Sequence, residues 1–407
     1  MSVRAIPALF ILFLLNSCAV KIEPAATPSE KSSPPQITLP GWKSKSFADT
    51  APPFAEQFAP RYLSLKDGEI ATYGICKDGT EIFSVIGQRN DSEYPGIHPL
   101  RLCFLPTSFL AGNSPYLKDT NKLTHEDGNY WEFCAFDLRT TIFQLFPSER
   151  KSAKGLLVYH TSIMLLSKVE QQFVHKMQKL GWNVMVGLPP DSLYRGRIPT
   201  MTSKLGTIEN GARLLADDMD LHHAEQAHST RAALAYLQKT RPSWLAGKKA
   251  LIGISAGSFG VPAEVKLNPD WDSIVLVSAG TNLLSTYESG AAGVFPNTLE
   301  WVKDVRKDPP EKVTHILTDE EFHTIYRRAA ELTKLHPGKT GSILRNYRLL
   351  TIHGRLDKVI PKEQTRKLHQ ILGNPERWTY PLGHHLIAVQ LVFDAKRIDH
   401  WLMEPVD

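Results

Sequence analysis

The sequence predicts an α/β protein with a doubly wound, mostly parallel sheet of eight strands, helices on both faces of the sheet and a helical cap insertion. Short runs such as GLLVYH at 155–160 and SIVLVS at 273–278 are apolar at nearly every position. This pattern is typical of strands that are covered on both faces. Longer amphipathic stretches separate these runs, and an alternation of strands and helices favours right-handed parallel crossovers.

The composition excludes several other classes of protein. The chain has 407 residues, of which 42% are hydrophobic and 22% charged, close to the average soluble domain. This composition excludes collagen, a coiled coil and a wholly disordered chain. Its 47 basic and 42 acidic residues give a net charge of +5, and the two signs are interleaved along the chain. Because a nucleic-acid binder concentrates its basic residues in a stripe, we expect no nucleic-acid partner.

Residues 1–40 are expected to precede the folded part. Arg4 leads into an apolar run from Ala5 to Leu15. Such a run makes about 16 Å of helix, too short for a hydrocarbon core of roughly 30 Å, so it indicates an export signal and not a membrane span. Residues 18–40 contain five prolines and three serines, which predicts a disordered tether.

The end of this signal resembles the lipobox of bacterial lipoproteins, since it reads Leu15-Asn16-Ser17-Cys18. The resemblance implies a signal peptide of residues 1–17 and a lipid anchor on Cys18 that attaches the protein to the cell envelope. Ala19 stands where an inner-membrane retention signal has Asp, which favours the outer membrane, with the protein facing the periplasm or the surface. An ordinary signal peptide with an unmodified cysteine is the alternative.

The other cysteines, Cys76, Cys103 and Cys134, have two interpretations. In an oxidising compartment two of them form a disulfide; otherwise all three are small buried hydrophobic residues.

The elements are expected in the following order. Residues 41–100 form an irregular or small β addition, and residues 101–407 form the main domain. Its strands are predicted at 101–105, 141–146, 155–160, 183–187, 250–254, 273–278, 347–353 and 377–380. Helices are predicted at 168–180 and 224–239. About sixty residues, 285–345, are too many for a plain crossover and predict a cap, in which Thr318 and Glu321 have the spacing of a helix capping box.

The strongest chemical signal follows the strand at 250–254. Gly253-Ile254-Ser255-Ala256-Gly257 has the G-x-S-x-G spacing, at the junction of a buried strand and the next helix. Glycines at both ends allow a tight turn that presents the Ser255 hydroxyl as a nucleophile. A glycine- and serine-rich turn without chemistry is the alternative.

Two later segments supply partners for this serine. Asp357 lies in the loop after the strand at 347–353, and Gly383-His384-His385 follows the strand at 377–380. The chain order serine, acid, histidine and the segments H-G-x-x-D-x-x-[VI]-P and G-H resemble those of α/β-hydrolases. The resemblance covers roughly residues 100–400. It implies that Ser255 is the nucleophile, Asp357 the orienting acid and His384 the base, with His385 as its rival.

The resemblance also implies an oxyanion hole made of two donors. One is the amide of Ala256, and the other comes from the loop after the strand at 155–160. In this loop Thr161 stands where the family often has glycine. The second donor is therefore left open between the amides and the hydroxyls of Thr161 and Ser162.

Other polar residues suggest no further chemistry. His222, His223 and His228 match no metal-ligand spacing and are interpreted as solvated residues at the start of the helix at 224–239. His160 is expected to bond locally to the backbone. The sequence has no phosphate-binding or dinucleotide-binding glycine motif, so neither a cofactor nor a metal is expected.

The resemblance thus implies a serine hydrolase that cleaves a carboxylic ester, either of a small molecule or of a lipid, at the cell envelope. The alternatives are an acyltransferase or a peptidase with the same triad, and an inactive hydrolase-like binding lipoprotein. The sequence does not determine the oligomeric state.

Overall fold

The computed structural model describes residues 70–75, 81–88, 102–106, 130–134, 138–162, 166–187, 201–202, 208–290, 298–304, 311–316 and 318–404. The proposed signal peptide, Cys18, the proposed tether and Cys76 lie outside these residues. Within them, every helix is too short or too polar to cross a membrane.

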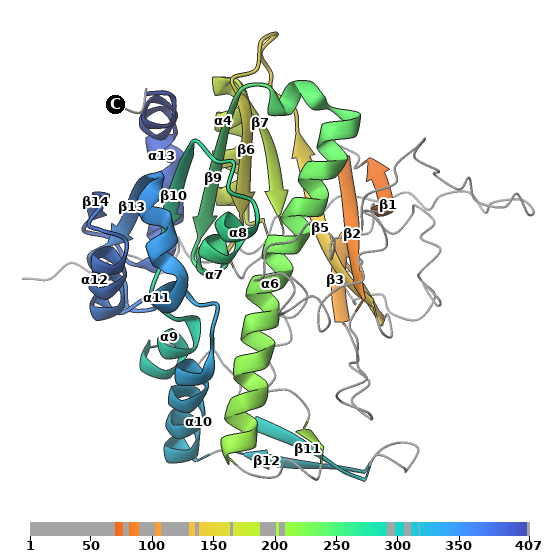
Figure 1. The fold of residues 1–407 in the computed structure, drawn as a ribbon, viewed down its shortest axis with the longest axis vertical. Coiled ribbons are helices and arrows are strands. Elements are labelled where there is room, and N and C mark those ends of the chain that lie inside the picture. Colours follow the sequence, from red (N-terminus) through yellow and green to blue (C-terminus); the bar gives the residue numbers. More distant parts are fainter. Residues whose placement is uncertain are drawn as a thin grey trace, which may run out of the picture.

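The centre of the fold is a mixed sheet to which the described residues contribute nine strands (Figure 1). Across the sheet the strands are β1 (Ile70–Ile75), β2 (Glu81–Gln88), β5 (Leu138–Phe146), β7 (Trp182–Gly187), β6 (Gly155–His160), β9 (Lys248–Ile254), β10 (Ser273–Val277), β13 (Arg348–Gly354) and β14 (Glu376–Tyr380). From β7 to β14 all neighbours are parallel, whereas β1, β2, β5 and β7 pair antiparallel. The predicted α/β class with a mostly parallel sheet is confirmed.

The predicted number of eight strands is wrong for this sheet. The segment predicted at 101–105 forms β3 (Leu102–Pro106), which pairs with β4 (Tyr130–Cys134) in a separate two-stranded sheet. In the register of that pair Cys134 is opposite Leu102, and Cys103 is opposite Phe133. Instead, β1 and β2 extend the main sheet from within the N-terminal addition. An apolar run predicts a strand but does not identify the strand with which it pairs.

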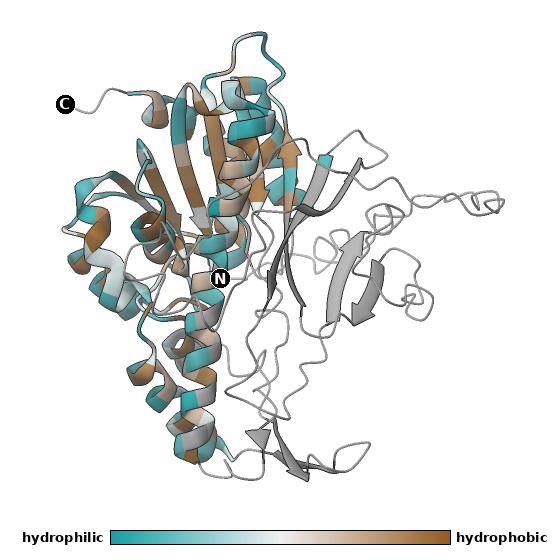
Figure 2. Cartoon of the chain, turned by 45° about the vertical axis from the view of Figure 1, so that its right-hand side comes forward, coloured by the Kyte–Doolittle hydropathy of each residue, from teal (hydrophilic) through white to brown (hydrophobic). Residues whose placement is uncertain are grey.

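Helices cover both faces of the sheet. On one face lie α4 (Lys168–Leu180) and α13 (His384–Met403); on the other lie α6 (Ile208–Thr240), the 3₁₀ turn η5 (Pro242–Leu245), α8 (Val261–Leu267) and α12 (Lys362–Ile371). Leu157 and Tyr159 of β6 point to the first face, and Leu156 and Val158 point to the second. Because both faces of these strands are buried, the strands are apolar at successive positions, as Figure 2 shows.

The predicted helix at 168–180 is confirmed by α4, which begins with a Ser167–Glu170 capping box and ends at Gly181 in the left-handed conformation. The helix predicted at 224–239 is the second half of α6, which begins at Ile208 and has 33 residues. The first half of α6 packs against α10 (Asp319–Leu332), and Ala212, Leu215 and Met219 lie in one apolar cluster with Ile325. This tertiary contact stabilises a segment whose own apolar pattern is weak.

The cap region is only partly helical, in contrast to the prediction. It contains α9 (Leu283–Gly290), β11 (Thr298–Asp304), β12 (Glu311–Ile316), α10, α11 (Pro337–Thr340) and the 3₁₀ turn η6 (Gly341–Asn346). β11 pairs with β12 and with β8 (Met201–Thr202) in a three-stranded sheet. The predicted capping box of Thr318 and Glu321 is confirmed at the start of α10.

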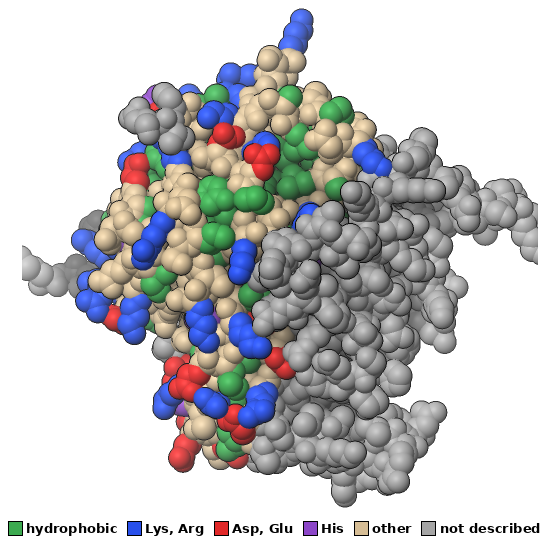
Figure 3. Space-filling model, viewed as in Figure 1, with side chains coloured by type: hydrophobic (Ala, Val, Ile, Leu, Met, Phe, Trp, Pro, Cys, Tyr) green, Lys and Arg blue, Asp and Glu red, His purple; other side chains and the backbone are tan. Residues whose placement is uncertain are grey.

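On the surface of α10 charges of both signs lie side by side (Figure 3). Arg328 pairs with Glu209 of α6 and with Glu331, and Arg327 pairs with Glu288 of α9. These ion pairs are exposed and link the three helices weakly.

Candidate active site

Ser255 occupies a strained turn between β9 and α7 (Ala256–Phe259). Its φ and ψ angles are 50° and −118°, a conformation that residues with a side chain rarely adopt. The amide of Ser255 donates to Val277 O of the neighbouring strand β10 at 2.8 Å, which holds the turn in place. Ser255 is 9% exposed, so the turn leaves only a small part of the residue accessible.

Both glycines of the G-x-S-x-G motif are required by close contacts. A Cβ on Gly253 would lie 2.7 Å from Ser258 Cα, and a Cβ on Gly257 would lie 2.6 Å from the carbonyl oxygens of His160 and Thr161. The second contact shows that the end of β6 lies directly against the turn that carries Ser255. The residues of the proposed oxyanion hole are therefore neighbours in space.

The structure brings Ser255, His384 and Asp357 into one hydrogen-bonded series. Ser255 Oγ lies 2.9 Å from His384 Nε2, and His384 Nδ1 lies 2.7 Å from Asp357 Oδ2. The side chains of His384 and Asp357 are largely buried, so water competes little for these bonds. These three residues stand in the places that the resemblance to α/β-hydrolases implies.

The choice between the two histidines is made by the start of α13. Gly383 is the N-cap of this helix and His384 its first residue, which directs the His384 ring towards Ser255. His385 is exposed and lies edge-on to His384, with the ring centroids 5.6 Å apart. Successive helical residues point about 100° apart. For this reason His384 and His385 cannot both face the serine.

Asp357 is held by the backbone of its own loop, which follows β13. Its Oδ1 accepts hydrogen bonds from the amides of Val359 and Ile360, both at 2.9 Å, while Oδ2 faces His384. Both carboxylate oxygens of Asp357 therefore accept hydrogen bonds, and these bonds fix the orientation of the side chain. The carboxylate presents one fixed oxygen to His384 Nδ1.

The donors of the proposed oxyanion hole differ in whether they already form a hydrogen bond within the protein. Ala256 is the first residue of α7, so its N–H has no partner within that helix. The amide of Thr161 donates to Gly187 O at 3.3 Å, and the amide of Ser162 donates to Glu170 Oε1 at 3.0 Å. Thr161 Oγ1 is buried and has no hydrogen-bond partner among the described residues.

Glu170, which the sequence did not single out, organises the loop after β6. Its carboxylate accepts from the amides of Ser162 and Ser167, both at 3.0 Å, and from the hydroxyls of Ser167 at 2.7 Å and Tyr159 at 3.2 Å. Burial raises the pKa of the Glu170 carboxyl, and the hydrogen bonds from Ser162 and Ser167 oppose this rise. The Ser167–Glu170 spacing is that of a capping box and was the signal in the sequence that could have identified this residue.

A second buried carboxylate, Glu264 of α8, lies behind the serine turn. Its Oε2 is 2.6 Å from His160 Nε2, and Gln226 of α6 donates to Gly257 O at 3.0 Å and to Glu264 Oε2 at 3.4 Å. The expectation that His160 bonds locally to the backbone is therefore wrong. Its ring connects β6 to α8, whose residues are distant in sequence.

The interpretation of His222, His223 and His228 as solvated residues at a helix start is also wrong. All three are buried in the middle of α6. Burial holds the pKa of His223 well below its ordinary value and lowers the pKa of His228 to about 3. Among the residues that the structure describes, no three His, Cys, Asp or Glu side chains are arranged to hold a metal ion.

Asp220 on the same helix connects α6 to the segment after α10. Its carboxylate accepts from the amides of Lys334 and Leu335 at 2.9 and 2.7 Å, and burial raises its pKa to about 6.

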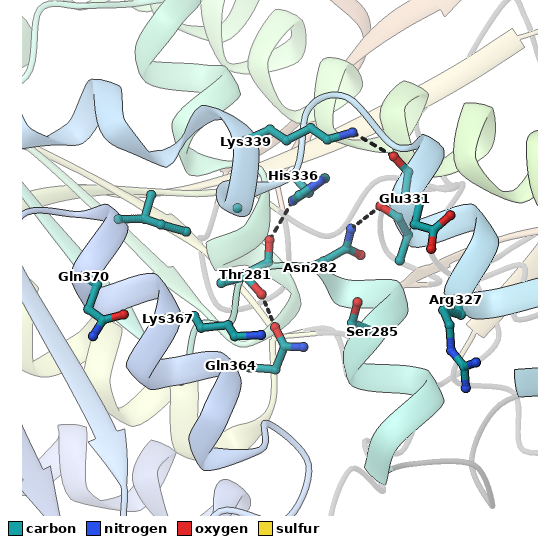
Figure 4. A pocket seen from close by; sticks show the side chains of 13 residues that line it. Thr281, Asn282, Ser285, Arg327, Glu331, His336, Lys339, Gln364, Lys367 and Gln370 are labelled. Atoms are coloured by element: carbon teal, nitrogen blue, oxygen red, sulfur yellow. Dashed lines mark hydrogen bonds between the residues drawn. The ribbon is translucent and has the colours of Figure 1, made fainter.

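A cavity of about 500 Å³, lined mainly by residues with polar or charged side chains, lies between α9, α10, α11 and α12 (Figure 4). His336 Nδ1 lies 2.9 Å from Thr281 O at its wall, and the Thr281 hydroxyl bonds to Gln364. None of Ser255, Asp357 and His384 lines this cavity, which is therefore separate from these three residues.

No family model matches the chain, and no curated protein matches it. Among solved structures it is similar to Est1E from Butyrivibrio proteoclasticus, at 12% identity and a TM-score of 0.39, over 65% of this chain and 96% of that one. It is also similar to an esterase domain from a Rhodothermus marinus protein, at 14% identity and a TM-score of 0.38, over 64% and 92% of the two chains. For the esterase Pf2001 of Pyrococcus furiosus the identity is 14% and the TM-score 0.38, over 74% and 92%.

Proposed function

We propose that the protein is a serine hydrolase that cleaves a carboxylic ester through an acyl-enzyme. The observation that carries this proposal is the unbroken series from Ser255 Oγ through His384 to Asp357, with bonds of 2.9 and 2.7 Å. A serine hydroxyl becomes a nucleophile when a base removes its proton and a third group orients that base. The position of Ser255 in a strained, tightly held turn further supports this role.

In the proposed reaction Ser255 Oγ attacks the acyl carbon, and His384 Nε2 takes the hydroxyl proton. Asp357 stabilises the imidazolium that forms. His384 then gives its proton to the leaving alcohol oxygen, and the ester C–O bond breaks. A water molecule, deprotonated by His384, attacks the acyl-enzyme and releases the acid and free Ser255.

For the oxyanion we propose the amide of Ala256 and the hydroxyl of Thr161, whose Oγ1 is buried in the free protein and becomes accessible when substrate binds. The amide of Ser162 is held by Glu170, and the amide of Thr161 by Gly187 O, whereas Thr161 Oγ1 has no partner among the described residues. A donor without another partner needs to break no bond when charge develops on the substrate oxygen. Thr161→Val keeps the shape of the side chain and removes only this donor, so we expect kcat to fall by about tenfold to a hundredfold.

We further propose that the protein is exported and carries its lipid anchor on Cys18, outside the described residues. The support comes from the short apolar segment and the lipobox-like sequence before this cysteine. The test is incorporation of an alkyne-tagged fatty acid in bacterial cells. Label that is present in the wild type and lost in Cys18→Ser supports the anchor; equal labelling of both chains overturns it.

The catalytic proposal is tested with a fluorophosphonate probe on the full chain. We expect the wild type to be labelled and Ser255→Ala to remain unlabelled. Ser278→Ala is a matched control, because Ser278 is also a buried serine with positive φ, and its Oγ has no partner among the described residues. An unlabelled wild type overturns the proposal and favours an inactive binding protein. If the wild type is labelled but does not hydrolyse p-nitrophenyl esters, the proposal of ester hydrolysis is replaced by one of acyl transfer or peptide cleavage.

A further inference from the structure

The three most exposed large apolar side chains of the described residues lie on the loop of Asp357 and on the helix that begins with His384. Phe393, Leu356 and Leu386 are 73%, 61% and 53% exposed. Leu356 directly precedes Asp357, and Leu386 comes two residues after His384. Single exposed apolar residues are ordinary on a protein surface, but three on the acid loop and the base helix call for a physical reason.

Backbone hydrogen bonds join the segments that carry these side chains. The amide of Leu356 donates to Leu382 O at 3.0 Å, which joins the acid loop to the segment that leads into α13. The amide of Leu386 donates to Gly383 O at 3.1 Å in the first turn of that helix. Leu386 and Phe393 are seven residues apart, so they lie on the same face of α13, about 10 Å from each other along its axis.

The opposite face of α13 packs on the sheet through Ile387, Leu391 and Ile398. The exposed face therefore cannot turn inward, and its apolar side chains remain in water unless another surface covers them.

Basic residues lie near the three apolar ones, either in sequence or in space. Arg355 and Lys358 flank Leu356 and Asp357 in sequence, and both are exposed. Lys176 of α4 donates to Val392 O at 2.8 Å and lies 6.0 Å from the centre of the Phe393 ring. Lys396, also exposed, follows Phe393 by about one helical turn.

None of the ion pairs within the described part of the chain uses Arg355, Lys358 or Lys396. The carboxylate closest in sequence to Phe393, Asp394, is engaged by the hydroxyl of Tyr380 and the amide of Gln390. The Asp394 carboxylate is a single negative charge among four basic side chains, so the net charge of this face is positive.

We propose that this face, the lipid-binding face, docks on an anionic lipid bilayer. It is defined by the apolar residues Leu356, Leu386 and Phe393 and the basic residues Arg355, Lys358, Lys176 and Lys396. The proposal rests on the proposed function and extends it, because docking next to Asp357 and His384 brings the triad to esters that lie in or at the membrane. Lipid esters are then the substrate class.

The composition of the face distinguishes a lipid surface from a protein partner. Stable protein interfaces bury roughly 800 Å² on each partner and have an apolar centre surrounded by a polar rim. Here three separate apolar side chains stand among four basic ones. Apolar side chains that enter the acyl region and cations that meet lipid phosphates are the combination by which proteins bind the membrane surface.

The experiment measures binding of the full chain to vesicles. All proteins carry Cys18→Ser, so that no lipid is attached at the proposed anchor, and Ser255→Ala, so that no lipid is consumed. Sedimentation with vesicles of phosphatidylcholine, with and without about 30% phosphatidylglycerol, gives the partition coefficient. One basic residue near an anionic surface strengthens binding about fivefold, and one inserted Leu or Phe about tenfold.

We therefore expect at least tenfold tighter binding to the anionic vesicles, and at least thirtyfold weaker binding of Leu386→Ser/Phe393→Ser to them. Ile208→Ser, an exposed apolar residue at the start of α6, is the matched control and should bind within twofold of the parent protein. Both side chains of the double variant are more than half exposed, so its thermal unfolding should match that of the parent.

The proposal is overturned if the double variant binds within twofold of its parent, or if both kinds of vesicle bind equally. It is also overturned if the protein forms dimers without vesicles and the double variant abolishes them, because the face would then cover a second copy. Labelling of the chain with Ser255 intact is measured separately. Loss of vesicle binding with intact labelling refutes only the lipid-binding face, and intact binding without labelling refutes only the proposed enzyme.

Discussion

Replacing Asp357 by asparagine tests whether the triad needs the charge of this residue or only its shape. The amides of Val359 and Ile360 both donate to Asp357 Oδ1, so an asparagine keeps its oxygen there and turns its NH₂ group towards His384. His384 Nδ1 must then accept a hydrogen bond, and the ring proton moves to Nε2. Nε2 faces Ser255 Oγ and can no longer remove its proton.

The size of the effect follows from the distance between the two charges in the transition state. Unit charges 2.7 Å apart attract by roughly 6 kcal/mol at an effective dielectric constant of about 20. At about 1.4 kcal/mol for each factor of ten, the loss corresponds to roughly four decades in rate. We expect kcat to fall about 10⁴-fold with little change in KM, because the imidazolium forms only during the reaction.

The assay is the second-order rate of fluorophosphonate labelling together with p-nitrophenyl ester hydrolysis. His385→Gln is the control, since this exposed ring lies beside His384 and should leave both rates within twofold of the wild type. Thermal unfolding checks that Asp357→Asn is folded. A labelling rate within tenfold of the wild type would refute the role assigned to the Asp357 carboxylate.

Three further predictions concern the surroundings of the triad. Glu170→Gln loses one of the oxygens that accept the Ser162 and Ser167 amides, so we expect labelling about ten- to a hundredfold slower and a loss of about 1–3 kcal/mol in urea unfolding; unchanged labelling would contradict a positioning role. Gly257→Ala places a Cβ 2.6 Å from two carbonyl oxygens of β6 and its loop, so we expect a loss of about 1–3 kcal/mol and slower labelling, and equal melting temperatures would contradict the contact. Burial lowers the pKa of His353 to about 3. As the pH falls through about 6.5, the unfolded chain therefore takes up a proton at this histidine while the folded chain does not. The contribution of neutral His353 to the free energy of unfolding is complete above pH 6.5 and decreases as the pH falls below that value. Urea unfolding should show that, from pH 8 to pH 5, the free energy of unfolding of the wild type falls by about 2 kcal/mol more than that of His353→Gln. Equal decreases in the two proteins would show that protonation of His353 does not cause this pH dependence.

The sequence predicted those features that depend on local pattern. The helix at 168–180 and the Thr318 capping box follow from residues within one or two turns of each other. The parallel strands follow from runs that are apolar at successive positions. The three residues of the proposed triad were predicted because each follows a strand of the sheet: Ser255 and Asp357 come after the buried strands β9 and β13, and His384 comes after the edge strand β14.

Contacts between residues that are distant in the chain could not be predicted from local sequence patterns. The pairing of β2 with β5, the early start of α6 at Ile208 and the strands of the cap depend on surfaces that meet only in the folded chain. The buried pair of His160 and Glu264 joins residues that are 104 positions apart, and neither has a motif of its own. The histidines of α6 were predicted to be solvated because they are polar, and the sequence does not show which face of a helix another helix covers.

The sequence by itself therefore determined the class of fold and predicted the serine, the acid and the histidine pair of the proposed triad, because strand periodicity and chain order are local properties. Only the tertiary structure decided between His384 and His385, since the cap of α13 directs one ring towards Ser255 and leaves the other in water. It also decided that Glu170 engages the Ser162 amide, because three-dimensional packing determines which partner a hydrogen-bonding group reaches.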